Sequence, residues 1–153
     1  MITNEHFDAT SWHDNPIHAF RIVEGVNGGG DLILDIDHIV EWVLHDDGYY
    51  GFTLVASDLT FHDVTDLVIS IDFPSCSAGL VPPSIHDIQR ETIKCPNDST
   101  GYKWGIDINW PRNSFIKFQA SGFTQTARSE PIAGQSQALP VAMRNVFGAP
   151  PRA

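Results

Sequence analysis

Histidine and aspartate are direct neighbours in this chain unusually often. Five of the seven histidines have an adjacent aspartate: His13-Asp14, Asp37-His38, His45-Asp46, His62-Asp63 and His86-Asp87. Imidazole and carboxylate groups both bind metals and carry protons, so these pairs raise the question of metal binding or acid-base chemistry. Adjacent side chains on a strand point to opposite faces, however, and cannot share one ion or proton unless a turn brings them round. The pairs are therefore interpreted first as markers of loop ends.

The segment 12–18, with the sequence Trp-His-Asp-Asn-Pro-Ile-His, concentrates such groups in one short turn. Two imidazoles and a carboxylate suit a divalent transition metal, and a further ligand would come from elsewhere in the chain, such as His62. The candidate metal ligands are His13, Asp14, His18 and His38. Their spacing matches no established ligand motif. The alternative is that His13 and Asp14 fix the turn by hydrogen bonds to the backbone, while His18 is an ordinary strand residue.

His38 is a candidate in its own right because it lies on the apolar side of a strand pattern. A buried imidazole needs a polar partner to offset its lost hydration. One interpretation is a hydrogen-bonded core histidine. The other places it in a barrel interior, as a ligand or general base beside Asp107 or His18. Asp35 and Asp37, two positions apart in the same strand, are expected on the opposite, solvent-exposed face as hydrated carboxylates.

Established catalytic and cofactor motifs are absent from the sequence. It contains no GxSxG, HExxH, GxGxxG or Walker loop. Asp31, Asp35 and Asp37 lack the central glycine and terminal glutamate of an EF-hand. The sequence therefore leaves catalytic residues unknown, and we predict no cofactor-binding residue. A divalent metal is the only cofactor considered, and an enzyme is disfavoured without being excluded.

The elements that would position these groups are β-strands. Apolar and polar residues alternate at 32–44, 67–73 and 104–110, which is the period of a half-buried strand. A helix over 37–44 is a local alternative. Weaker patterns raise the total to about eight strands and lie at 17–24, 49–56, 58–62, 85–93 and 114–123. Short turns between them favour an antiparallel meander, so we predict an all-β fold with minor α content, either a β-sandwich or a partly closed barrel.

Two segments fall outside this pattern. Residues 73–84 contain three prolines and should form a long irregular loop, which is a candidate rim for a site. After residue 127 the composition turns to Ala, Gln, Pro and Gly, which we expect not to continue a sheet. The chain is therefore divided into a β domain, residues 1–126, and an extended tail, residues 127–153, with a short helix near 141–146.

Composition limits the classes of partner. The net charge of −10, with nine scattered Lys and Arg, disfavours nucleic acid and fits a cationic protein partner or cations. The chain starts without a signal-peptide pattern and contains no long apolar run, so we expect a cytoplasmic protein that does not enter a membrane. In that compartment Cys76 and Cys95 are expected as free thiols rather than as a disulfide.

Three segments resemble an uncharacterised family of small bacterial proteins, and the resemblance covers nearly the whole chain. The segments are Trp12 to His18 (WHDNPIH), Leu34 to Trp42 (LDIDHIVEW) and Ser121 to Gln125 (SGFTQ). More loosely, the early His-Asp turn and the segment 60–69 are similar to small β proteins among bacterial toxin-immunity families. This second resemblance implies a partner-binding role and identifies no functional residue.

The leading hypothesis is a small cytoplasmic β domain without catalytic activity that binds another protein, as an immunity-like or accessory protein with an acidic surface. The first alternative is a β-barrel that binds a divalent metal or a small ligand, with or without metal-dependent catalysis. The second alternative is a self-associating structural subunit, such as a homodimer paired through exposed strand edges.

Overall fold

The computed structural model describes residues 1–26, 29–74 and 79–140. Regular structure in these ranges is almost entirely β-strand, apart from the 3-10 helix η1 (Asn4–Ala9). The strands are β1 (Ile2–Thr3), β2 (Ile17–Glu24), β3 (Gly30–Leu44), β4 (Tyr50–His62), β5 (Thr65–Ser70), β6 (Ser84–Lys94), β7 (Thr100–Trp110), β8 (Phe115–Ala120), β9 (Gly122–Ala127) and β10 (Ile132–Gly134). The helix considered for 37–44 is therefore wrong, because these residues belong to β3.

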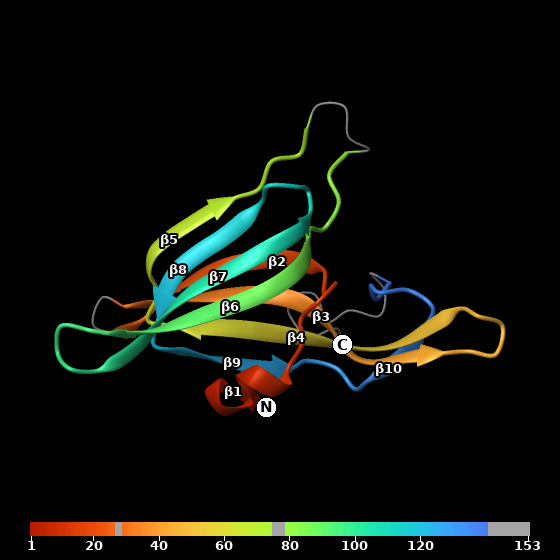
Figure 1. Ribbon diagram of the computed structural model, residues 1–153, viewed down its shortest axis with the longest axis horizontal. Helices are drawn as coiled ribbons and strands as arrows, with labels where there is room; N and C mark the ends of the chain where they lie inside the picture. The colour runs from red at the N-terminus through yellow and green to blue at the C-terminus, as the bar shows by residue number, and fades with distance from the viewer. Residues whose placement is uncertain (27–28, 75–78, 141–153) are drawn as a thin grey trace, which may run out of the picture.

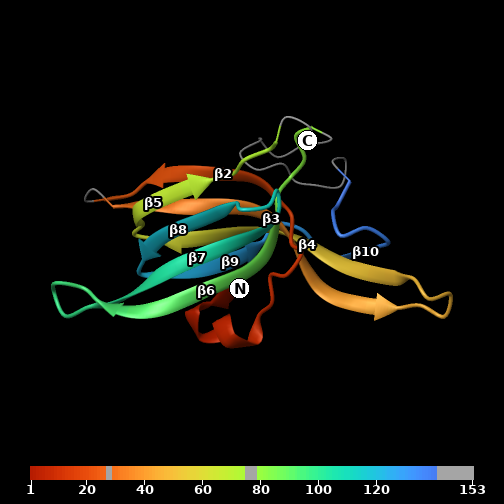
Figure 2. The ribbon, with the colours of Figure 1, turned by 45° about the horizontal axis from the view of Figure 1, so that its top comes forward.

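The strands form two antiparallel sheets that pack as two layers (Figures 1 and 2). One sheet has the order β1-β9-β4-β3-β2, and β10 pairs with β4. The other has the order β5-β8-β7-β6. Neither sheet closes into a barrel. The predicted all-β class is confirmed, and of the two predicted architectures the structure is a β-sandwich.

The structure merges two of the predicted strands and divides another. Segments 49–56 and 58–62 form the single strand β4, which pairs with β3 along its whole length. Segment 114–123 is divided at Ser121, where the chain leaves β8 in one sheet and enters β9 in the other. Gly122 leaves room for the Asn4 side chain at this corner, because a Cβ at that position would lie 2.1 Å from Asn4 Nδ2.

The core between the sheets is dominated by aromatic rings. Phe61 from β4 contacts Phe118 and Trp104 of the opposite sheet, with ring centroids 4.6 Å and 5.1 Å apart. Trp12 reaches the same cluster, and its Nε1 donates to the buried Gln125 Oε1 at 2.8 Å. Large rings contribute strongly to burial, and the hydrogen bond removes the cost of burying the indole N–H. This packing holds the segment 12–18 against the core.

The segment after residue 127 takes part in the fold. Strand β10 pairs with β4, with Ile132 opposite Leu54. Leu139 is buried and belongs to a second apolar cluster with Ile39 and Leu54. The expectation that this composition does not continue a sheet is therefore wrong, because β4 extends past the end of β9 and offers a free edge. The helix predicted near 141–146 lies outside the described residues.

The loop and cysteine predictions are only partly covered by the structure. Residues 73–74 and 79–83 have no regular structure, as expected for the 73–84 loop. Cys95 carries a free thiol, while Cys76 lies outside the described residues. Within the described ranges, no helix has both the length and the apolar character needed to cross a membrane.

Candidate functional site

The turn of residues 12–18 joins the two sheets by backbone hydrogen bonds. The Asp14 N–H donates to the Ile85 carbonyl oxygen at 2.7 Å, and the Ile85 N–H donates to the Asn15 carbonyl oxygen at 2.9 Å. The Ile17 N–H donates to Pro83 O at 2.7 Å. Asp14 has a φ of 62°, a left-handed conformation that aspartate tolerates better than most residues. The segment is therefore firmly held, and its side chains are fixed relative to both sheets.

Two imidazoles and a carboxylate meet on the outer side of this turn. His13 Nδ1 donates to the His86 carbonyl oxygen at 2.9 Å, and its Nε2 lies 3.5 Å from Asp14 Oδ2. His86 Nδ1 donates to Asn109 Oδ1 at 3.0 Å, and Asn109 Nδ2 donates to Asp14 Oδ1 at 2.6 Å. The two imidazole rings lie edge to face with centroids 5.4 Å apart. This network connects the turn to β6 and β7 on the surface.

His38 is a buried, hydrogen-bonded core residue. Only 7% of its surface is exposed, and its Nδ1 accepts a hydrogen bond from Asn15 Nδ2 at 2.9 Å. Asn15 is fully buried, and its Oδ1 accepts from the Ile39 N–H at 3.3 Å. Burial disfavours the imidazolium and lowers the pKa of His38 below its ordinary value of 6.5. Of the two interpretations of His38, the structure shows the core histidine.

His18 forms a pair with a deeply buried carboxylate. Its Nε2 lies 2.8 Å from Asp37 Oδ2, which also accepts a hydrogen bond from the Leu139 N–H at 2.9 Å. Asp37 is fully buried, so its expected place on the solvent face is wrong. The carboxylate fixes the orientation of the imidazole and its tautomer, with the hydrogen on Nε2.

Asp35 is also buried rather than hydrated, with 2% of its surface exposed. Arg128 donates through Nη2 to Asp35 Oδ1 and through Nη1 to Asp58 Oδ1. Burial of the guanidinium acts to lower the pKa of Arg128, but the hydrogen bonds and charges of Asp35 and then Asp58 raise it overall. Arg128, which follows β9, thus supplies a counterion to the buried carboxylate.

His62 and Asp63 occupy a turn, where the sequence pattern placed them. His62 ends β4, and its Nδ1 lies 3.3 Å from Asp31 Oδ2 while its Nε2 lies 3.0 Å from Thr124 Oγ1. Asp63 has a φ of 54° and accepts a hydrogen bond from Ser121 Oγ at 2.8 Å. These contacts hold together the two corners at which the chain changes sheet.

Of the four candidate metal ligands, His13 and Asp14 contact each other, whereas His18 and His38 have partners outside the set. His13 contacts His86 and Asp14, His18 contacts Asp37, and His38 contacts Asn15. Across the ranges that the structure describes, no group of three or more His, Cys, Asp or Glu side chains is arranged to hold a metal ion. The structure places His13 beside Asp14 and gives His18 and His38 separate hydrogen-bond partners.

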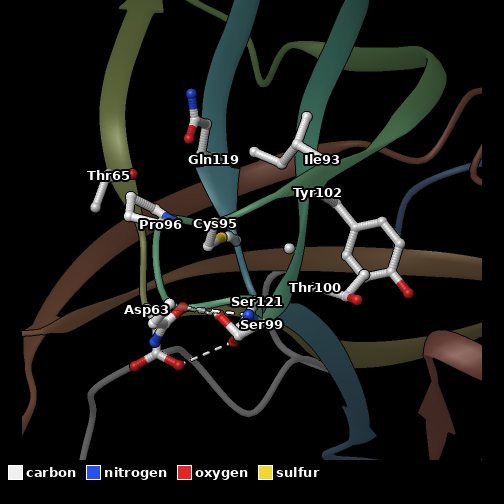
Figure 3. Close-up of a pocket in the computed structure, with 13 residues that line it drawn as sticks. Asp63, Thr65, Ile93, Cys95, Pro96, Ser99, Thr100, Tyr102, Gln119 and Ser121 are labelled. Carbon is white, nitrogen blue, oxygen red and sulfur yellow. Dashed lines mark hydrogen bonds between the residues drawn. The ribbon is translucent and has the colours of Figure 1, made fainter.

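A pocket of about 500 Å³ surrounds Cys95 between the β6–β7 hairpin and the corner at Ser121. Figure 3 shows the thiol beside Pro96 and Gln119, with Tyr102 on β7 and Asp63 hydrogen-bonded to Ser121. None of the described lining residues carries an imidazole or an amine that could accept the thiol proton. Thiol catalysis needs a thiolate, usually generated by such a group. The pocket has no arrangement that would activate Cys95.

The distal part of the β3–β4 hairpin, residues 40–52, extends beyond the two layers and is called the arm below (Figures 1 and 2). Its exposed apolar residues are Val40, Trp42, Val43, Leu44, Tyr49 and Tyr50. Trp42 pairs with Phe52 and Leu44 with Tyr50, so these four side chains share one face. The Trp42 ring lies edge-on to the Phe52 ring at 5.0 Å. The arm presents an ordered aromatic surface to solvent.

Sequence patterning did not identify the arm as exposed. Val40, Trp42 and Leu44 continue the apolar alternation of the buried β3 residues, and they were predicted to share one face with them. A register shift at Ile39/Glu41 and the end of the covering sheet put them in solvent instead. One signal was available in the sequence: residues 22–89 contain twelve Asp and Glu and no Lys or Arg. This acidic half of the chain includes the whole arm.

Comparison of the chain with protein-family models, with curated proteins and with solved structures found no match.

Proposed function

We propose that this protein acts by binding another protein, without catalysis of its own, and that the arm is its docking surface. The observation that carries the proposal is the exposure of large apolar side chains on the arm: 44% for Trp42, 61% for Leu44 and 52% for Tyr50. Single exposed apolar residues are ordinary on protein surfaces, but a contiguous exposed apolar patch marks an interaction site.

The architecture of the arm supports this role. A two-stranded hairpin is marginally stable in water when no third strand or second layer supports it. Strand β10 pairs with β4 up to Phe52, at the base of the arm, so the arm beyond Phe52 depends on side-chain pairing. The edge-to-face contact of Trp42 with Phe52 supplies part of that support. Tyr50 lies on the other side of Trp42, with ring centroids 6.4 Å apart. The rings are held in position before any partner arrives, so less side-chain freedom is lost on binding.

Charge indicates the chemistry of the partner. The arm also carries Glu41, Asp46 and Asp47, and the surrounding segment 22–89 contains no Lys or Arg. An acidic surface of this kind accelerates association with a basic partner and disfavours a second acidic copy. We propose a partner with an apolar groove bordered by Lys or Arg. Self-association, which would bring two chains of net charge −10 together, is the competing outcome.

The proposal is tested by placing a photocrosslinking amino acid at position 42 in living cells, followed by binding measurements with the purified crosslinked partner. Trp110 provides the matched control, because it is exposed to nearly the same extent, 42%, and lies on β7 outside the arm. We expect Trp42→Ser to weaken binding of the purified partner by about 30-fold or more, the size typical of a central aromatic residue. Trp110→Ser should leave the affinity unchanged.

Salt and mass measurements complete the test. Association should slow as the ionic strength rises, because steering by exposed charges is screened. If position 42 crosslinks only to a second copy of the chain and light scattering gives a dimer, self-association replaces the proposal. Equal affinity of wild type and Trp42→Ser for the partner would also refute the arm as the docking surface.

A further inference from the structure

The two sheets leave a pocket of about 730 Å³ on the side where their edge strands β2 and β5 face each other (Figure 2). Its volume lies within the range of small-molecule sites, about 300–1,000 Å³. It is lined by Ile17, His18, Ala19 and Phe20 from β2, Ile69 from β5, and Ile71, Phe73, Leu80, Val81, Pro82 and Pro83 from the loop region. The pocket is distinct from the arm, and the inference below does not rest on the proposed function.

The pocket exists because the opposite sheet ends before it covers β2. Phe20 pairs with Leu34, a fully buried core residue, so both side chains point to the inner face of their sheet. Phe20 nevertheless has 48% of its surface exposed. The strand opposite, β5, ends at Ser70, and beyond it the pocket is bordered by Phe73 and Leu80. Apolar side chains that belong to the inner face are thus left facing an open pocket.

One polar side chain belongs to this apolar lining. His18 is fixed by its Nε2–H, which donates to Asp37 Oδ2 at 2.8 Å. Asp37 is fully buried, and the Leu139 N–H also donates to Oδ2, so the carboxylate itself is held in place. No hydrogen bond to His18 Nδ1 occurs within the described residues. The imidazole therefore has a fixed orientation, and Nδ1 is the ring nitrogen left for a ligand.

We infer that this pocket binds an uncharged apolar molecule that donates one hydrogen bond to His18 Nδ1. The absence of charge is indicated by the lining: none of the described lining residues is Asp, Glu, Lys or Arg, in a chain of net charge −10. An anionic ligand would face the buried Asp37 carboxylate behind His18 and would lose its hydration without gaining a cation. An uncharged aliphatic or aromatic molecule with one hydroxyl or N–H group has no charge and can donate the hydrogen bond.

The test uses two fluorescent probes that differ in one charge. N-phenyl-1-naphthylamine is uncharged and apolar and has a single N–H donor. Its anionic counterpart, 8-anilino-1-naphthalenesulfonate, has the same ring system with an added sulfonate. We expect the uncharged probe to bind the full-length protein with a stoichiometry of one and with enhanced fluorescence. The sulfonate should bind at least about tenfold more weakly, because its charge would have to enter an apolar pocket.

Matched variants locate the probe. Phe20→Asp puts a charge in the lining and should weaken binding by about tenfold or more. Ile22→Asp makes the same kind of change two residues along β2, at a 68% exposed side chain that does not line the pocket, and should bind as wild type does. Retained circular dichroism spectra would show that both variants fold.

The hydrogen bond has a separate test. His18→Leu should weaken the probe by about two- to tenfold, the range expected for one net hydrogen bond. The N-methylated probe, which has no N–H, should bind wild type and His18→Leu equally. If wild type and His18→Leu differ in affinity for the N–H probe but not for the N-methylated probe, the lost interaction is a hydrogen bond and not a change of pocket shape. If the two proteins differ equally with both probes, the role of His18 is refuted.

Three outcomes would overturn the inference. The first is absence of a fluorescence change with the uncharged probe. The second is equal binding by wild type, Phe20→Asp and Ile22→Asp, which would place the probe elsewhere. The third is binding that appears only after truncation following Pro140, which would show that residues 141–153 occupy the pocket in the full chain.

Discussion

The titration of His38 should make the stability of this protein depend on pH in a predictable direction. The imidazole is buried, and Nδ1 accepts a hydrogen bond from Asn15 Nδ2 at 2.9 Å, so the native state keeps His38 neutral. Burial lowers the pKa of His38 in the native state below its ordinary value of 6.5. When the pH falls through 6.5, the unfolded chain therefore binds a proton that the native state does not. The free energy of unfolding must decrease as the pH falls.

The magnitude follows from one proton. Between the unfolded pKa of 6.5 and the lower native pKa, the loss approaches about 1.4 kcal/mol per pH unit. Other histidines titrate as well, so the effect of His38 is obtained by difference. His38→Gln retains a side-chain acceptor for Asn15 and removes the titration. Its stability should therefore fall less steeply than that of wild type below pH 6.5, and the two should have parallel pH dependence above pH 7.5.

A second variant should give a titration effect of the opposite sign. Asn15→Asp replaces the donor at 2.9 Å from His38 Nδ1 with a carboxylate oxygen, which favours the imidazolium. The pKa of His38 should then rise above the unfolded value. The stability that this pair contributes is present below pH 6.5 and is lost as the pH rises through the raised native pKa.

The assay is urea denaturation followed by tryptophan fluorescence at constant ionic strength, at several values of pH from 5 to 8. Parallel stability profiles for wild type and His38→Gln across that range would refute the neutral, buried His38. If Asn15→Asp folds but its free energy of unfolding does not show the predicted opposite dependence on pH relative to wild type, the assigned contact between Asn15 and His38 is wrong. If Asn15→Asp does not fold, the comparison with His38→Gln still decides the first prediction.

Three further perturbations test other parts of the structure. Arg128→Met should destabilise the fold by about 1.5–3 kcal/mol at pH 7, because it removes a charged hydrogen-bond donor to the buried Asp35. A change of less than about 1 kcal/mol on urea denaturation would contradict that pairing. Leu139→Ala should cost about 2–5 kcal/mol by the same assay, whereas an unchanged midpoint would show that the segment after β10 is not packed as described. Addition of EDTA should leave the thermal midpoint unchanged. If zinc raises the midpoint of wild type and His13→Ala abolishes this increase, the metal-binding alternative is restored.

Several features of the fold could be predicted from local pattern. The alternation at 67–73 and 104–110 indicated half-buried strands, and the structure places β5 and β7 over most of these residues. Short turns between strands indicated antiparallel pairing, which every strand pair shows. These predictions succeed because strand period and turn chemistry depend on residues close together in the sequence.

The candidate site was predictable only in part. His38 was recognised as an apolar-face histidine in need of a partner, and Asn15 supplies the hydrogen bond. His18 was identified as a polar residue of interest, but its partner Asp37 was expected in solvent. The outer face of β3 is covered near Asp37 by the segment around Leu139, which follows it by about a hundred residues. No local pattern can indicate that a distant segment will cover a strand.

The sequence by itself indicated most of the strands, the turns between them and the acidic character of residues 22–89, because these depend on local residue types. The tertiary structure decided which side chains are covered. Leu34 and Trp42 belong to one alternating pattern, yet Leu34 is fully buried and Trp42 is 44% exposed. The difference arises because the register shift at Ile39/Glu41 interrupts the alternation and the second sheet ends before the arm begins. Burial depends on what packs above a residue rather than on the residue itself.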